Sequence, residues 1–261
     1  MTNHSRFAND EIEKLLAANG LQTLDDAFRV GDFLSGQHYR RATRHKNKHV
    51  VKFDLQSPTG PTTVYIKRQW RRERWLPRPT DIRHRINLFC SPVHEWRGLR
   101  LLEGIGVNVS QPLAVFWSGW GFSRGAVVTR GLPPELSMAD LLLSGKLLAM
   151  PTERLNSMID EAVRIVVQLH QHGISWRSMK AKHFYPEELA DGSWRIWLID
   201  CEGVYRWASR RDCQREWKAF VTTFTTHTSS LQKPFLAAYD RVISGRGAAQ
   251  KSDAVALKRS A

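Results

Sequence analysis

The residues best suited to chemistry lie in one stretch, between the end of a predicted amphipathic helix and an acid that follows an apolar run. Arg177 and Ser178 occupy a polar loop after that helix, and His183 begins a short predicted strand. An Asp-Gly turn then leads into the apolar strand Ile196–Ile199, which is followed by Asp200. A guanidinium, a hydroxyl, an imidazole and a carboxylate are thus brought into one short stretch as candidates for an active site. An ordinary hairpin, in which Asp200 merely caps the next turn, is the alternative interpretation.

The order of helix, loop, β-hairpin and acid is the layout of the catalytic centre of a protein kinase. The loop there reads H-R-D-x-x-x-x-N, and the acid begins D-F-G. Alignment places Arg177 at the arginine, His183 at the asparagine and Asp200 at the magnesium-binding aspartate. Trp176 stands where histidine is usual, and Ser178 stands where the catalytic base is usual. The phasing therefore fits, whereas the most diagnostic residue differs.

Composition limits the class of protein. A chain of 261 residues can hold one large or one two-lobed domain, and 42% hydrophobic residues is ordinary for a globular protein with a core. Lys and Arg number 39 against 25 Asp and Glu, so the formal net charge is +14. This surplus predicts an anionic partner, such as nucleic acid, a phosphorylated sugar or an anionic membrane face, without choosing among them.

Cysteine usage and hydropathy bear on location. Cys90, Cys201 and Cys213 form no CxxC pair and no zinc spacing, which indicates reduced thiols in the cytosol. Residues 1–10 have no apolar signal core, and no apolar stretch approaches the ~18 residues of a membrane span. We therefore expect a cytoplasmic protein, for which any membrane contact would be peripheral, on the inner face of the cytoplasmic membrane.

The elements that would position these groups begin with a helix over about residues 10–19. Two alternating runs, 50–55 and 63–67, predict a β-hairpin. Its second strand ends at Lys67, where kinases carry the lysine that contacts the nucleotide. A merely solvated lysine is the alternative.

A helix is predicted over residues 92–104, with Glu95 one turn in, where the kinase glutamate pairs with that lysine. Acids are also common at helix starts because they complement the helix dipole. Strands are then expected over 112–115 and 126–129. Residues 130–134 would form the hinge between two lobes.

Residues 67–85 combine closely spaced arginines with tryptophans and two prolines, which predicts a positive, partly apolar loop or broken helix. Arginine suits bidentate phosphate recognition, and tryptophan suits a boundary between water and an apolar phase. A solvated basic face is the alternative. The candidates for an acceptor or anionic membrane surface are Arg71, Arg72, Arg74 and Trp75.

The remaining elements are predicted to be helical. A short helix covers 137–143, and a longer amphipathic helix over 151–172 leads into the loop with Arg177. Two more helices follow, one after Asp212 and one over about 233–243.

The chain resembles the lipopolysaccharide core kinases of the Kdo/WaaP type from Gram-negative bacteria, over about residues 33–242. An F-L-x-x-Y pattern at residues 235–239 also fits, and some members carry histidine in place of the loop asparagine. The other matching positions are Lys67, Glu95, the hinge near Arg130, the loop from Ser178 to His183, Asp200 and Asp212.

The resemblance implies an α+β, bilobal protein-kinase-like fold. A small antiparallel-sheet N-lobe with one helix would cover 33–130, and a larger, mainly helical C-lobe would cover 131–244. An N-terminal helical extension (1–32) and a disordered basic tail (245–261) would flank them.

The resemblance also implies an activity, the phosphorylation of heptose or Kdo in the lipopolysaccharide inner core with ATP and Mg²⁺. The acceptor would be met at an anionic membrane surface, and no nucleic acid is expected as a partner. The catalytic residues would be Arg177, Ser178 and Asp200. The nucleotide would be bound by Lys67, Glu95, Thr129 and Gly131, and the metal by His183 and Asp200.

Two departures from the family pattern leave alternatives open. Where the family has an aspartate that accepts the sugar hydroxyl proton, this chain has Ser178, which cannot act as a base near pH 7. The glycine-rich loop is reduced to Gly36 with His38 and several arginines, whose side chains could hold phosphates instead. A pseudokinase scaffold of the same pathway is therefore a second hypothesis. A nucleic-acid binder is a third, suggested by the charge but without any recognised motif.

Overall fold

The structure is a computed structural model, which describes the chain at residues 3–29, 48–70, 91–119, 124–134, 136–206, 208–226 and 228–243. The chain divides into two compact units. Unit 1 comprises Met1–Pro133 and Ile199–Tyr205, and unit 2 comprises Pro134–Leu198 and Arg206–Ala261. Helices combine with an antiparallel sheet and an antiparallel hairpin, which confirms the mixed α+β class.

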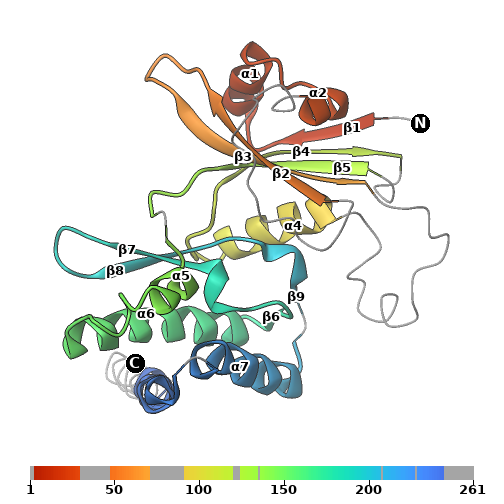
Figure 1. The fold of residues 1–261 in the computed structure, drawn as a ribbon. Helices are drawn as coiled ribbons and strands as arrows, with labels where there is room; N and C mark the ends of the chain where they lie inside the picture. The colour runs from red at the N-terminus through yellow and green to blue at the C-terminus, as the bar shows by residue number, and fades with distance from the viewer. Residues whose placement is uncertain are drawn as a thin grey trace, which may run out of the picture. The chain divides into compact units, whose positions relative to one another are not determined.

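Unit 1 is built on a five-stranded antiparallel sheet in the order β1-β4-β5-β3-β2 (Figure 1). The predicted hairpin is present, and positive φ at Gly60 allows the chain to turn between its strands. The strands are β1 (Asn3–Phe7), β2 (Lys48–Leu55), β3 (Thr62–Trp70), β4 (Pro112–Ser118) and β5 (Arg124–Arg130).

Both faces of this sheet are covered by helices, because successive side chains of a strand point to opposite faces. Figure 1 shows α1 (Asp10–Ala18) and α2 (Leu24–Arg29) on one side and α4 (Ser91–Glu103) on the other. The first face buries Val64, Ile66, Ala126 and Val128 against Ile12, Leu16, Leu24 and Phe28. The second face buries Val115 and Val127 against Val93 and Trp96.

Unit 1 has two features that the local sequence patterns did not indicate. Residues 3–29 begin with β1, which pairs with β4, so this segment belongs to the sheet unit. The strand was missed because four of its five residues are exposed and it carries no alternating apolar pattern. In addition, Ile199–Tyr205 clusters with unit 1 although its neighbours in sequence belong to unit 2.

Unit 2 is mainly helical. Its helices are α5 (Met138–Leu143), α6 (Thr152–Gln171), α7 (Arg210–Thr225) and a last helix over 232–243. Capping boxes begin α5 at Ser137 and α7 at Ser209. The short strands are β6 (Ile174–Trp176), β7 (Phe184–Glu188) and β8 (Trp194–Leu198), with β9 (Val204–Arg206) at the border of the units. None of the helices in the described residues is long and apolar enough to span a bilayer.

Candidate functional site

Lys67 lies at the centre of a charged cluster in unit 1. In the sheet it is opposite Val50 and Val127, so its side chain projects from the face that α4 covers. Its Nζ is 2.5 Å from Glu95 Oε2 and 2.5 Å from Asp200 Oδ1. The ion pair predicted between Lys67 and Glu95 is therefore present, and the interpretation of Lys67 as a merely solvated strand end is wrong.

Asp200 does not act as a side-chain cap for the turn that follows. It precedes the 3-10 turn Cys201–Gly203, but its side chain makes no capping hydrogen bond there. Its backbone is left-handed, with φ 57° and ψ 48°, a conformation that aspartate tolerates better than most residues. Its carboxylate contacts Lys67 and is about one-third exposed, at 33%. The alternative interpretation of an ordinary capped hairpin is therefore wrong.

Close packing against α4 holds the segment that carries Asp200. Cys201 is fully buried, and its carbonyl oxygen lies over Gly98. A Cβ atom at Gly98 would be 2.1 Å from that oxygen, so only glycine permits this approach. The helix that supplies Glu95 therefore also fixes the backbone between Asp200 and Glu202.

Glu202 is a third acid of the cluster, and sequence reasoning missed it. Its Oε2 is 3.6 Å from Lys67 Nζ and 2.8 Å from Nζ of Lys48 on β2. The hydroxyl of Ser91, at the start of α4, donates to the same carboxylate. The only signal in the sequence was the second acid in D-C-E-G, two residues after Asp200.

The protonation behaviour follows from three acids around two lysines. Burial lowers the pKa of Lys67, but the charges of Glu95, Asp200 and Glu202 outweigh burial and raise that pKa well above its usual value. Burial, reinforced by the charges of Asp200 and Glu202, raises the pKa of Glu95 to about 7 although Lys67 opposes this. For Glu202, burial is outweighed by the nearby lysines, so its pKa is lowered. With all five groups ionised the cluster carries one excess negative charge.

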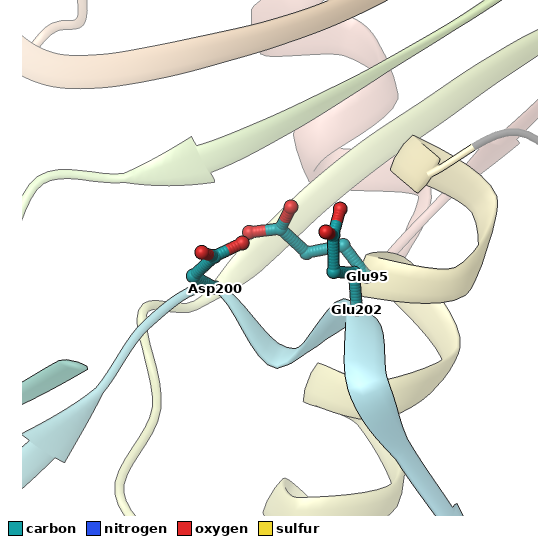
Figure 2. Close-up of side chains that lie close together, drawn as sticks. All are labelled: Glu95, Asp200 and Glu202. Atoms are coloured by element: carbon teal, nitrogen blue, oxygen red, sulfur yellow. The ribbon is translucent and has the colours of Figure 1, made fainter. Parts of the chain in front are cut away.

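The donor set fits a hard divalent cation. Oxygen atoms of Glu95, Asp200 and Glu202 all lie within 4.8 Å of one another, and Figure 2 shows the three carboxylates gathered together. Mg²⁺ prefers such oxygen ligands, and a divalent charge would offset the excess negative charge of the cluster.

The loop predicted to be catalytic belongs to unit 2. Arg177 is exposed, and the Ser178 hydroxyl is buried without a hydrogen-bond partner in the described part of the chain. Trp176, at the position of the kinase histidine, is fully buried and stacks on His183 with ring centroids 5.5 Å apart. The predicted role of His183 as a metal ligand remains a prediction.

Glu216 anchors this loop, and sequence reasoning missed it as well. It lies on α7 at 3% exposure and accepts hydrogen bonds from the Ser175 hydroxyl and from the Trp176 backbone N–H, at 2.9 Å. Asp212, which was matched to the family pattern, lies in the first turn of the same helix and forms the capping box with Ser209. The available signal was an acid in register with the apolar residues of the same helix, four positions before Phe220.

The other predicted site residues divide into two groups. Thr129 is buried on β5, and the Gly131 N–H donates to the Thr63 carbonyl at 2.8 Å; their expected contacts with a nucleotide remain predictions. A second set lies outside the described residues, namely Gly36, His38, Arg71, Arg72, Arg74, Trp75 and the tail 245–261.

Comparison with known proteins shows which family the chain belongs to. The model of the lipopolysaccharide kinase (Kdo/WaaP) family matches residues 37–239. A solved structure described as WaaP in complex with acyl carrier protein is similar in fold, with a TM-score of 0.64 and 16% sequence identity. The match covers 91% of this chain and 89% of that one. No curated protein matches the sequence. The family match spans most of the chain, which therefore belongs to the lipopolysaccharide kinase (Kdo/WaaP) family.

Proposed function

We propose that this protein is an ATP-dependent kinase that phosphorylates a sugar, heptose or Kdo, of the lipopolysaccharide inner core. The observation that carries the proposal is Lys67 held between Glu95 and Asp200 in a chain of this family. A lysine fixed between two acids is pre-positioned to meet phosphate oxygens, and this lysine–glutamate pair is a requirement of kinase sites.

Each group has a role in this proposal. Lys67 binds the α- and β-phosphates and is oriented by Glu95, while Thr129 and Gly131 border the nucleotide. Asp200 and Glu202 hold Mg²⁺, which neutralises phosphate charge when bound. The two units are the lobes of a protein-kinase-like fold, with the hinge near residues 130–134.

A pseudokinase is a second candidate, and Ser178 is the observation that favours it. A serine cannot accept the proton of the sugar hydroxyl near pH 7, and general bases typically contribute about 10²–10⁴-fold to a rate. The nucleotide site in unit 1 would then serve binding or scaffolding. In the kinase proposal, phosphoryl transfer depends mainly on positioning and charge neutralisation, so it does not require this base. Ser178→Asp should then raise the rate of phosphoryl transfer or leave it unchanged.

The test is Mg²⁺-dependent transfer of the γ-phosphate from ATP to lipopolysaccharide core oligosaccharide, followed by mass spectrometry. We expect transfer by the wild type and none by Asp200→Asn. Asp10→Asn makes the same chemical change at an exposed position and should retain wild-type transfer. If the wild type and Ser178→Asp both bind ATP but neither transfers its γ-phosphate, the pseudokinase would be favoured. Transfer that Asp200→Asn leaves intact would contradict the proposed site.

A further inference from the structure

The strand that precedes Lys67 in the hairpin brings a second lysine to the same cluster. We propose that Lys48 is a second phosphate-binding lysine of the nucleotide site. It would be held ready by Glu202 and would take over part of the task that a glycine-rich loop performs elsewhere. This inference rests on the proposed function, because it assigns a further contact to the same nucleotide.

Strand register places the two lysines on one face of the sheet. Val50 on β2 is directly opposite Lys67 on β3, and Lys48 is opposite Gln69. Side chains two residues apart on a strand share a face, so Lys48, Val50 and Lys67 all project toward α4. Diagonal neighbours in an antiparallel pair have Cα atoms about 7–8 Å apart, a distance that two long side chains can bridge.

The contacts of Glu202 show that one anionic group fits between the two lysines. Lys48 Nζ lies 3.0 and 2.8 Å from the two carboxylate oxygens of Glu202. Lys67 Nζ lies 3.6 Å from the second of these oxygens. A phosphate group also offers several anionic oxygens, so it can bridge the same two ammonium groups in the same way.

Lys48 is also able to exchange partners. Its side chain is 21% exposed, and its third contact is the Ser91 hydroxyl at 3.1 Å, a neutral group. Glu202 belongs to the acids suited to Mg²⁺, and a carboxylate shared with a cation holds a lysine less firmly. With both nucleotide and metal bound, Lys48 therefore has a phosphate oxygen as its best acceptor.

The test compares Lys48→Met with Lys52→Met by calorimetric titration of ATP, ADP and adenosine in Mg²⁺. Lys52 is the matched control because it lies on the same strand and face, is exposed and loses the same charge. We expect Lys48→Met to weaken ATP binding by about 10- to 100-fold. ADP should be affected as well, adenosine hardly at all, and Lys52→Met should match the wild type.

Several outcomes would overturn the inference. If Lys48→Met and Lys52→Met bind ATP equally while Lys67→Met loses it, the proposed function stands and this role of Lys48 does not. Equal losses for ATP and adenosine would make Lys48 a structural residue. If the wild type binds no ATP, the proposed function fails with it.

A second variant keeps the inference testable if Lys48→Met does not fold. Glu202→Gln removes the charge that competes for Lys48, so in EDTA it should bind ATP more tightly than the wild type. Weaker or unchanged binding of ATP in EDTA would contradict the inference.

Discussion

At the scale of single residues, the arrangement of Lys67 shows how a buried charge is kept in place. Its side chain is 16% exposed, and Glu95 beside it is 8% exposed, so neither group is well hydrated. Removing one partner of such a pair leaves a charge buried and uncompensated, which typically costs about 3–5 kcal/mol. The raised pKa of Glu95 reduces this cost, because the carboxyl can bind a proton and become neutral.

Replacing Lys67 should therefore affect nucleotide binding and stability in different ways. We expect Lys67→Ala to weaken ATP binding by about 100-fold, because the charged hydrogen-bond donor is lost. In EDTA its free energy of unfolding should fall as pH rises from about 5 to about 8. An acid whose folded pKa exceeds its unfolded pKa binds more protons when folded, so it loses stability over that window.

Urea unfolding at several pH values, together with ATP titrations, measures both effects. The matched control is the double variant Lys67→Ala with Glu95→Gln, which lacks the titrating carboxyl and should show a much flatter profile. A stability of Lys67→Ala that rises over this pH range, or unchanged ATP affinity, would contradict the assignment of Lys67.

At the scale of elements, α4 has two roles: it supplies Glu95, and it packs against the segment that follows Asp200. We predict that Gly98→Ala costs about 1–3 kcal/mol of stability, since its methyl would overlap the Cys201 carbonyl. The displaced segment should also weaken binding of ATP in Mg²⁺. Gly104→Ala adds the same group just after α4, where the nearest atom is the Arg100 carbonyl oxygen at 3.3 Å, and should leave ATP affinity unchanged. Equal thermal unfolding and ATP affinity in the two variants would refute this role of Gly98.

The second prediction at this scale concerns the tie between α7 and the loop of unit 2. In Glu216→Ala, the buried Trp176 N–H and Ser175 hydroxyl lose their acceptor, which costs about 1–3 kcal/mol for each group. Asp212→Ala removes one half of a capping box, worth about 1 kcal/mol, and an exposed ion pair with Arg215, which is worth little. We expect Glu216→Ala to unfold at lower urea concentration than Asp212→Ala. Its kcat should fall while its KM for ATP changes little, because Lys67 and Asp200 belong to the other unit.

A stability of Glu216→Ala equal to that of Asp212→Ala would show that the loop does not depend on this acid. Glu216→Gln retains one acceptor oxygen and should lie between Glu216→Ala and the wild type.

Local patterns were sufficient to predict most elements and part of the site. The hairpin of β2 and β3 followed from its alternation, whereas the Lys67–Glu95 pair followed from matching the order of strand and helix to the kinase layout. The contact between Lys48 and Glu202 joins residues 154 positions apart, so no local pattern contains it. Glu216 was overlooked because its register with the apolar residues of α7 indicates burial at most, and only the fold shows which donors surround it.

At the scale of the whole molecule, the net charge of +14 requires an explanation that the cluster in unit 1 does not give, since its two lysines face three acids. The arginine- and tryptophan-rich run at residues 67–85 is the strongest candidate, although residues 71–85 lie outside the described part of the chain. We propose that it contacts the acceptor or an anionic membrane surface.

Replacing Arg71, Arg72 and Arg74 together with serine should reduce binding to lipopolysaccharide or anionic vesicles while ATP affinity survives. The effect should be largest at low salt, where exposed charges are least screened. A control variant with the same loss of three charges at exposed positions replaces Lys14, Lys52 and Lys218 with serine. Unchanged vesicle binding with a collapse of ATP binding would assign the run to the nucleotide site. Salt-dependent binding to nucleic acid much tighter than to lipopolysaccharide would favour the nucleic-acid alternative.

The central claim is that Lys67, Glu95 and Asp200 form the phosphate and metal site of a kinase. A crystal structure with a non-hydrolysable ATP analogue and Mg²⁺ tests it most directly. We predict the α- and β-phosphates at Lys67 Nζ, the Lys67–Glu95 pair intact and the metal ion on Asp200. The same structure would show which side chain faces the γ-phosphate. A triphosphate bound elsewhere, or Lys67 and Glu95 turned apart in the nucleotide-bound protein, would contradict the claim.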